Sequence, residues 1–104
     1  MFTLRRGTAN EINQYNSFCV DNVGETIEVA ENAQGQIVGY MMRTGSTIYY
    51  IESDAAGVGS FLVDSIKERF EYAAADNVQK TAEGFWAAMN FQPEGDQWTW
   101  YEGE

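Results

Sequence analysis

The sequence has no histidine, one cysteine and one proline, and these shortages exclude several classes of site. Without histidine there can be no Ser-His-Asp or Cys-His catalysis, and the commonest metal ligand is missing. Cys19 has no partner for an internal disulfide, so we expect a free thiol in a reducing compartment. The carboxylates show no calcium-loop spacing. The sequence therefore predicts no metal site.

Basic residues are also few. Six Lys and Arg stand against sixteen Asp and Glu, which gives a formal net charge of −10. Such a charge repels nucleic acid and anionic membranes and attracts cationic partners, either a small amine or a basic protein. No apolar run of about 18 residues suggests a membrane span, and the first residues lack the apolar stretch of a signal peptide. We expect a cytoplasmic protein that binds neither nucleic acid nor membranes.

What the chain does have is material for a core. Its 104 residues are 44% hydrophobic and 14% aromatic, enough for one domain and too few for two. No repeat, linker or low-complexity stretch divides it. We therefore treat residues 1–104 as a single domain.

The first half reads as a strand, a helix and an antiparallel meander. Thr8 to Glu11 form a T-x-x-E capping box, which predicts the start of a helix. Ile12, Tyr15, Phe18 and Cys19 would share one face of this helix, and Gly24 would end it. Residues 26–31 alternate, with Ile27 and Val29 on one side and acids on the solvent side. The strands are expected over residues 2–5, 26–31, 36–43 and 47–53.

The second half switches to a helical period. Val58, Leu62, Ile66 and Phe70 recur at steps of four, after a small-residue loop over 54–59. An apolar strand over 72–75 should run parallel to the strand over 47–53, through a right-handed crossover. Residues 81–89 follow as a helix that Asn90 would end in the left-handed conformation, and residues 91–93 and 97–102 form a hairpin. The predicted class is α/β, an α+β mixed sheet.

The most specific local feature is Gly57-Val-Gly59, between a strand and a helix. A helix start carries free backbone N–H groups and a positive dipole, which favour phosphate, and glycines let the backbone approach an anion closely. A tight strand-to-helix turn without any ligand would explain the same residues. The loop alone leaves both interpretations open.

Three segments, in order, resemble the GNAT (GCN5-related N-acetyltransferase) superfamily. Leu4-Arg-Arg-Gly-Thr-Ala-Asn-Glu-Ile12 resembles the usual first strand and helix start. Tyr49-Tyr-Ile-Glu-Ser-Asp-Ala-Ala-Gly-Val-Gly59 resembles the strand and (Arg/Gln)-x-x-Gly-x-(Gly/Ala) loop. Gln79-Lys-Thr-Ala-Glu-Gly-Phe-Trp-Ala-Ala-Met-Asn-Phe91 is similar to Asn-x-x-Ala-x-x-x-Tyr-x-x-x-Gly-Phe. The resemblance implies a GNAT-like fold, with acetyl-CoA as cosubstrate and an amine acceptor that attacks the thioester directly.

Carried over by position, the resemblance implies a cofactor site and its chemistry. Backbone groups of the strand would meet the acetyl and pantetheine parts, and the loop would hold the pyrophosphate. Glu52 is the best-placed base, with Glu28 and Glu31 as alternatives, although each could be a solvated surface charge. Tyr101 or Tyr72 could protonate the leaving thiolate. The implied cofactor-binding residues are Tyr49, Tyr50, Ile51, Asp54, Ala55, Ala56, Gly57, Val58, Gly59, Ser60, Gln79 and Trp86.

The sequence departs from the family pattern at several positions. Asp54 stands where Arg or Gln is usual, and Trp86 stands where the family's acidic Tyr is expected, although an indole N–H is no usable acid. The helix usually found before the meander is missing, which implies an open acceptor groove or one completed by another subunit. These departures keep a second function open, a GNAT-fold regulatory protein without catalysis that binds a basic partner. Mimicry of nucleic acid by the acidic surface is a weaker third reading.

The aromatic residues near the end also have two interpretations. Alternation puts Trp98 and Trp100 on the same face of a strand, with Tyr101 next to them. They could pack in the core, or form an exposed surface used for homodimerisation or for binding another partner.

Overall fold

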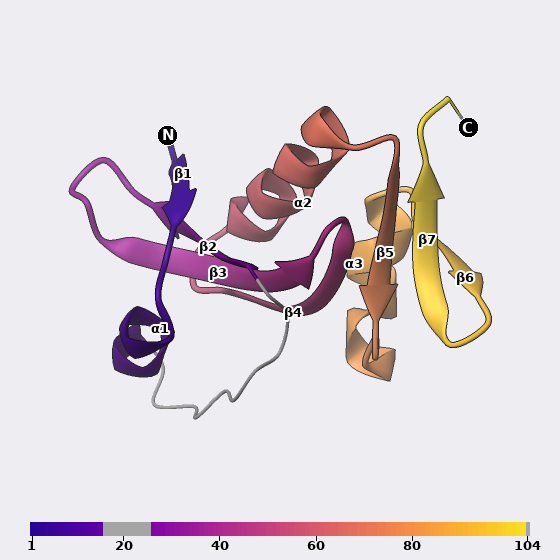
Figure 1. The fold of residues 1–104 in the computed structure, drawn as a ribbon, viewed down its shortest axis with the longest axis horizontal. Helices are drawn as coiled ribbons and strands as arrows, with labels where there is room; N and C mark the ends of the chain where they lie inside the picture. Colours follow the sequence, from indigo (N-terminus) through magenta and orange to yellow (C-terminus); the bar gives the residue numbers. More distant parts are fainter. Residues whose placement is uncertain (16–25, 104) are drawn as a thin grey trace.

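The computed structural model describes residues 1–15 and 26–103, with the side chains of residues 13–15 left out. Over these residues it shows one seven-stranded mixed sheet in the order β1-β2-β3-β4-β5-β7-β6 (Figure 1). The order of helices and strands is the predicted one. The elements are β1 (Thr3–Arg6), α1 (Ala9–Tyr15), β2 (Thr26–Glu31), β3 (Ile37–Thr44), β4 (Thr47–Ser53), α2 (Val58–Arg69), β5 (Tyr72–Asp76), the 3-10 turn η1 (Lys80–Ala82), α3 (Glu83–Ala88), β6 (Gln92–Glu94) and β7 (Gln97–Tyr101).

The sheet is antiparallel except where β4 and β5 run side by side. The predicted crossover from β4 through α2 to a parallel β5 is confirmed. β7 lies between β5 and β6, so the hairpin folds back with its second strand against β5. None of the described helices is long and apolar enough to cross a membrane.

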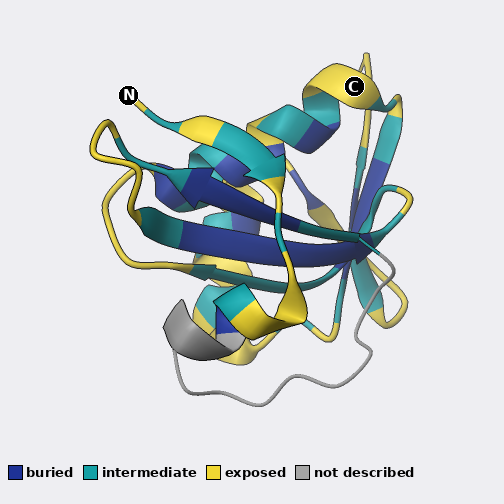
Figure 2. Ribbon diagram, turned by 60° about the vertical axis from the view of Figure 1, so that its left-hand side comes forward, coloured by how far each residue is buried: buried dark blue, intermediate teal, exposed yellow. Residues whose placement is uncertain are grey.

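Two apolar clusters cover opposite faces of the sheet. One joins α2 and α3 to the sheet and includes Val58, Leu62, Ile66 and Trp86. The spacing of four predicted for α2 is thus confirmed, and Phe70 caps the helix end. The other cluster joins Ile12 of α1 to Val29, Tyr40 and Met42. Both faces of the central strands are therefore buried, as the dark ribbons of Figure 2 show.

This two-sided burial overturns the prediction that the acids of β2 face solvent. Ile27 and Val29 do lie on the α1 side, but Glu28 is only 7% exposed, because α2 covers the other face. Its carboxylate accepts from Arg43 Nε at 2.7 Å and from Arg69 at 2.9 Å. Burial raises the pKa of the Glu28 carboxyl, but the hydrogen bonds from the two arginines outweigh burial and hold the pKa below its ordinary value.

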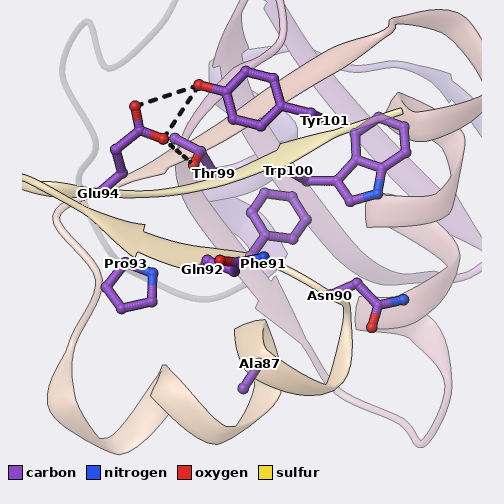
Figure 3. A pocket seen from close by; sticks show the side chains of 9 residues that line it. All are labelled: Ala87, Asn90, Phe91, Gln92, Pro93, Glu94, Thr99, Trp100 and Tyr101. Atoms are coloured by element: carbon purple, nitrogen blue, oxygen red, sulfur yellow. Dashed lines mark hydrogen bonds between the residues drawn. The ribbon is translucent and has the colours of Figure 1, made fainter. Parts of the chain in front are cut away.

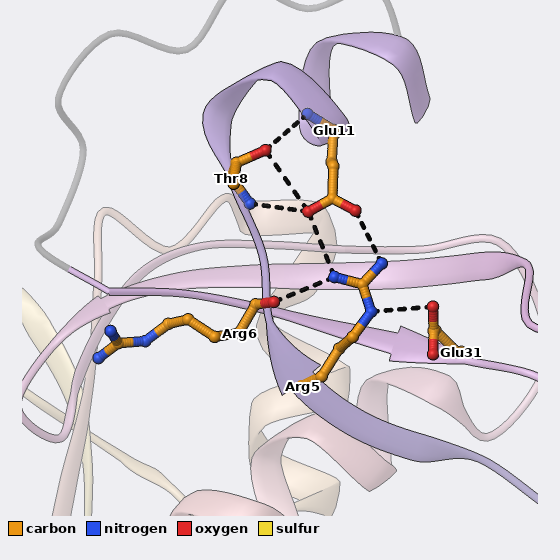
Figure 4. Close-up of polar contacts among 5 residues, drawn as sticks. All are labelled: Arg5, Arg6, Thr8, Glu11 and Glu31. Carbon is orange, nitrogen blue, oxygen red and sulfur yellow. Dashed lines mark hydrogen bonds and ion pairs between the residues drawn. The ribbon is translucent and has the colours of Figure 1, made fainter.

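The capping box at the start of α1 is confirmed. The Thr8 N–H donates to Glu11 Oε1 at 3.0 Å, and the Glu11 N–H donates to Thr8 Oγ1 at 3.2 Å (Figure 4). Arg5 adds a clamp, since its guanidinium also pairs with Glu11 at 2.7 Å and with Glu31 at 2.9 Å. The hydrogen bond from Arg5 lowers the pKa of the Glu11 carboxyl. The side chains of Tyr15, Phe18 and Cys19, and the stop at Gly24, lie outside the described residues.

The C-terminal part also follows the prediction. The expected helix over 81–89 is divided into η1 and α3, and Asn90 adopts the left-handed conformation with φ 69°. Trp98 and Trp100 both pack, partly buried, against the cluster under α2. Of their two interpretations, core packing is the one that the structure confirms.

Candidate functional site

A β-bulge at Tyr49 separates β4 from its parallel neighbour. Against β3, Tyr50 pairs with Met42 and Ile48 pairs with Arg43, which leaves Tyr49 as an extra residue. Against β5, only Thr47 and Ile48 are paired. A bulge bends its strand and increases the local twist. β4 therefore leaves β5 at the residue where the bulge begins.

The bulge also resets which side chains of β4 face the helices. In a regular strand Ile48 and Ile51 would point to opposite faces. Here both contribute to the cluster under α2 and α3, whereas Tyr50 packs on the α1 side against Tyr40, with ring centroids 6.0 Å apart. The end of β4 thus places Ile51 on the face under α2 and α3 and Tyr50 on the face under α1.

The gap between the two strands forms a cleft of about 330 Å³, which we call the splayed cleft. A second hollow of about 290 Å³, the loop-side hollow, shares Ile51, Glu52, Ala82 and Trp86 with it and extends to Ser53, Gly59 and Phe85. The splayed cleft is lined by Ile48, Tyr49, Tyr50, Ile51, Glu52, Asp76, Asn77, Val78, Gln79, Ala82 and Trp86.

The loop-side hollow meets the first turn of α2 at Gly59, and no side chain caps this helix start. Gly57 precedes the helix in the left-handed conformation, with φ 86°. The Phe61 N–H donates to the Gly57 carbonyl, so the N–H groups of Gly59 and Ser60 belong to the first turn, where no intrahelical acceptor exists. A Cβ on Gly59 would lie 3.1 Å from the Phe85 ring. The start of α2 and the Phe85 ring of α3 therefore approach closely at this residue.

The electrostatics of the cleft are acidic. Its lining includes the carboxylates of Glu52 and Asp76, and no Lys or Arg is among the described residues that line either hollow. Burial raises the pKa of the Tyr50 hydroxyl, and the neighbouring Glu52 charge raises it further. An anion bound here would depend on backbone N–H groups, and a cation would be attracted by the carboxylates.

No family model matches the sequence, and no curated protein matches it either. Solved structures do. The NMR structure of YhhK from E. coli, assigned to the N-acetyltransferases and solved bound to coenzyme A, superposes with a TM-score of 0.73 at 14% identity, over 97% of this chain and 98% of that chain. Ard1 from Thermoplasma volcanium gives 0.67 at 16% identity, over 99% of each chain. An Exiguobacterium protein assigned to the acetyltransferases gives 0.59 at 15% identity, over 97% and 93%.

The chain has the GNAT fold. On this fold, the predicted site residues come together around the splayed cleft and the helix start. Tyr49, Tyr50, Ile51, Glu52, Gln79 and Trp86 line the cleft, and Gly59 lines the loop-side hollow. Asp54, Ala55, Ala56 and Gly57 are exposed in the loop, Ser60 is half-buried, and Val58 is buried in the core.

Other predicted residues of the GNAT site lie elsewhere. Tyr72 and Tyr101 pair with each other at the end of β5 remote from the cleft, and the Tyr101 hydroxyl donates to Glu94 at 3.2 Å. Glu28 is held by Arg43 and Arg69, and Glu31 by Arg5. The structure does not bring these side chains to the cleft.

Sequence reasoning missed part of the cleft wall. Asp76, the last residue of β5, and Asn77, which follows it, line the cleft, and Asn77 has a positive φ of 54°. An Asp-Asn pair after an apolar strand is a turn signal, and asparagine tolerates the left-handed conformation. That signal could have indicated the chain reversal. It could not have indicated that the reversal faces β4.

Proposed function

We propose that this protein binds acetyl-CoA in the splayed cleft and transfers the acetyl group to an amine. The observation that carries the proposal is the divergence of β4 from β5 at Tyr49, beside an uncapped helix start. Among the described residues, the backbone groups of β4 beyond Ile48 pair with no residue of β5. They can therefore hydrogen-bond an extended pantetheine chain, while the first turn of α2 receives the pyrophosphate. That YhhK, of the same fold, was solved with coenzyme A supports this assignment.

The reaction would be direct acyl transfer. Glu52 lines both hollows, half-buried, and would take a proton from the acceptor ammonium or amine. The amine nitrogen attacks the thioester carbonyl carbon, the C–N bond forms, and backbone N–H groups stabilise the oxyanion. The C–S bond then breaks, and the leaving thiolate takes up a proton. The products are an amide and free CoA.

The proton for the thiolate needs a donor other than Trp86. The indole of Trp86 is 3% exposed and packs against Phe91, with ring centroids 4.9 Å apart. Tyr101 lies outside the cleft, so its predicted role as the acid has no geometric support. Tyr49 and Tyr50 are the tyrosines that line the cleft. We assign the donor role to one of their hydroxyls.

The charge of the cleft supports a cationic acceptor. Glu52 and Asp76 both line it, and the whole chain carries −10. Two carboxylates attract an ammonium group and orient its nitrogen toward the thioester. A small polyamine and a lysine-bearing peptide are both consistent with this chemistry.

A non-catalytic role is the second candidate, and one observation favours it. The family's acid position is taken by the buried Trp86. A protein that binds acetyl-CoA and a basic partner without turnover would need the cleft and the acidic surface but no acid. Binding and turnover must therefore be measured separately.

The test of the binding site is an Ala56→Glu variant. Ala56 is exposed in the loop before α2 and its φ is not positive, so glutamate is accommodated without backbone strain. Its carboxylate beside the helix start should repel the pyrophosphate and weaken acetyl-CoA binding by about tenfold or more. Ala33→Glu, in the exposed turn after β2, adds the same charge at a remote place and should leave affinity unchanged.

Calorimetric titration of acetyl-CoA decides among the outcomes. Binding that Ala56→Glu weakens and Ala33→Glu keeps would support the proposed site. Failure of the wild-type protein to bind would overturn the proposal. Release of free thiol with an amine panel would then separate the acyltransferase from the non-catalytic binding protein.

Replacing Asp54 is expected to strengthen acetyl-CoA binding, the opposite of the effect of Ala56→Glu. It is exposed in the loop where a cationic or neutral residue is usual, and its charge opposes a phosphate. Asp54→Gln should strengthen acetyl-CoA binding about threefold at low ionic strength, and the gain should shrink at high salt because exposed charges are screened. An affinity unchanged by the substitution at low salt would place the pyrophosphate away from this loop.

A further inference from the structure

The two strands that flank the splayed cleft meet at one of its ends. β4 and β5 are paired at Thr47–Ala74 and Ile48–Ala75, and they diverge after these residues. Ile48 and Ala75 are both buried, so packed side chains close the point where the strands meet. The start of α2, where we place the pyrophosphate, follows the other end of β4. An extended acetyl-CoA would therefore bring its acyl group toward the closed end of the cleft.

The wall of the cleft on the side of α2 and α3 is apolar and tightly packed. Ile48, Val78 and Trp86 line the cleft and belong to the cluster under these helices. The Trp86 indole meets Phe85 and Phe91 edge-on, with ring centroids 5.0 Å and 4.9 Å away. A buried ring held between two others cannot turn aside for a larger ligand unless the core repacks. The indole is therefore a fixed wall.

The wall on the α1 side is charged. In β4, Ile51 faces α2 and α3, so alternation puts Glu52 on the other face of the sheet. In β5, Ala73 and Ala75 belong to the cluster under the helices, which puts Asp76 on the α1 side as well. Both acids are half-buried in the lining of the cleft. An alkyl chain turned this way would take carboxylate surface out of water and return no hydrogen bond.

We propose that the cleft accepts only a short acyl group, acetyl or propionyl, and that Trp86 sets this limit. The inference rests on the proposed acetyl-CoA site and names the acyl donors that this site takes. A longer chain has to displace the indole on one side or cover the carboxylates on the other. Trp86 is thus a specificity-determining residue at the position where the family pattern has tyrosine.

The dependence of acyl-CoA binding on chain length tests this limit without an acceptor and without turnover. Calorimetric titrations of the wild-type protein with acetyl-, propionyl-, butyryl- and hexanoyl-CoA measure it. Affinity should fall about tenfold or more from acetyl-CoA to butyryl-CoA, because a filled apolar pocket discriminates to this extent against one excess methylene. Trp86→Phe makes room beside the chain and should bring the affinity for butyryl-CoA within about threefold of that for acetyl-CoA.

Trp100 provides the matched control. It packs, partly buried, against the same cluster, but it lines a hollow of about 460 Å³ at the β6–β7 hairpin (Figure 3). None of the described residues that line this hollow also lines the splayed cleft. Trp100→Phe therefore removes the same atoms elsewhere in the core and should leave the order of the acyl-CoA affinities unchanged.

Every outcome decides the inference. An affinity that falls with chain length and is restored for butyryl-CoA by Trp86→Phe alone supports it. Equal affinities across the series, a fall that Trp86→Phe does not relieve, or relief by Trp100→Phe as well would overturn it and leave the acetyl-CoA site standing. If acetyl-CoA itself does not bind, the proposed function fails and this inference fails with it. If Trp86→Phe does not fold, Val78→Ala, which shortens the same wall, should relieve the limit instead.

Discussion

Replacing Glu28 by glutamine is expected to lower the free energy of unfolding by about 3 kcal/mol near neutral pH. The Glu28 and Arg43 side chains are 9% and 10% exposed, and Arg69 closes the network from the end of α2. Glutamine keeps the size of the side chain but removes the charge, so the Arg43 cation stays buried without its counterion. Arg43 also donates to the Gly45 carbonyl, so the loss would reach the turn that leads into β4.

The stability that Glu28 contributes should depend on pH in a defined direction. The pKa of Glu28 is lowered in the folded protein, so its contribution is fully present above the unfolded pKa and is lost as pH falls through the folded pKa. The difference in stability between wild type and Glu28→Gln should therefore be largest near pH 7 and shrink below about pH 4. Urea unfolding at several pH values measures it.

Glu68→Gln is the matched control for Glu28. Glu68 is exposed on the same helix that supplies Arg69, and its replacement should change stability by less than about 0.5 kcal/mol. Equal effects of the two substitutions, or a Glu28 effect that persists undiminished in acid, would contradict a stabilising role for the buried carboxylate.

The features of this fold that could be predicted from the sequence are those determined over short stretches. Thr8 and Glu11 make reciprocal bonds three residues apart, and the period of Val58, Leu62 and Ile66 reports one helix face. Gly57 and Gly59 marked the loop before α2 by residue type alone, and Gly57 takes a positive φ there, which glycine adopts at little cost. The loop and the strands around the site could be predicted from the sequence for this reason.

The features that could not be predicted depend on what packs from elsewhere. Tyr49 is a bulge only relative to the register of β3, and no local pattern specifies that register. Glu28 was expected to be solvated because the alternating pattern was taken to mean that one face of the strand is exposed to solvent. In the structure α2 covers that face. Tyr101 seemed available as an acid, but the pairing of β7 with β5 puts Tyr101 opposite Tyr72, at the end of β5 that is remote from the cleft. Site chemistry inferred from residue type alone fails at such positions.

Gly39→Ala is expected to cost about 2 kcal/mol of stability and to weaken acetyl-CoA binding at the same time. A Cβ at residue 39 would lie 2.5 Å from Val58 Cγ1 and 2.9 Å from the Glu52 carbonyl oxygen. The valine could rotate, but the carbonyl belongs to the backbone of β4. The methyl group would therefore push the end of β4 and the start of α2 apart, and these two segments form the wall of the cleft and the proposed pyrophosphate site.

The matched control is Gly84→Ala, the same substitution in α3. A Cβ there meets nothing within 4 Å, and the residue has no positive φ. Alanine has the higher helix propensity, so this variant should gain about 0.5 kcal/mol or more. Opposite signs for the two substitutions would show that the close approach of β3 to the start of α2, rather than glycine flexibility, makes Gly39 necessary. If Gly39→Ala changed neither the stability nor the affinity for acetyl-CoA, the end of β4 would be free to shift. That result would contradict the rigid strand end on which the proposed binding site depends.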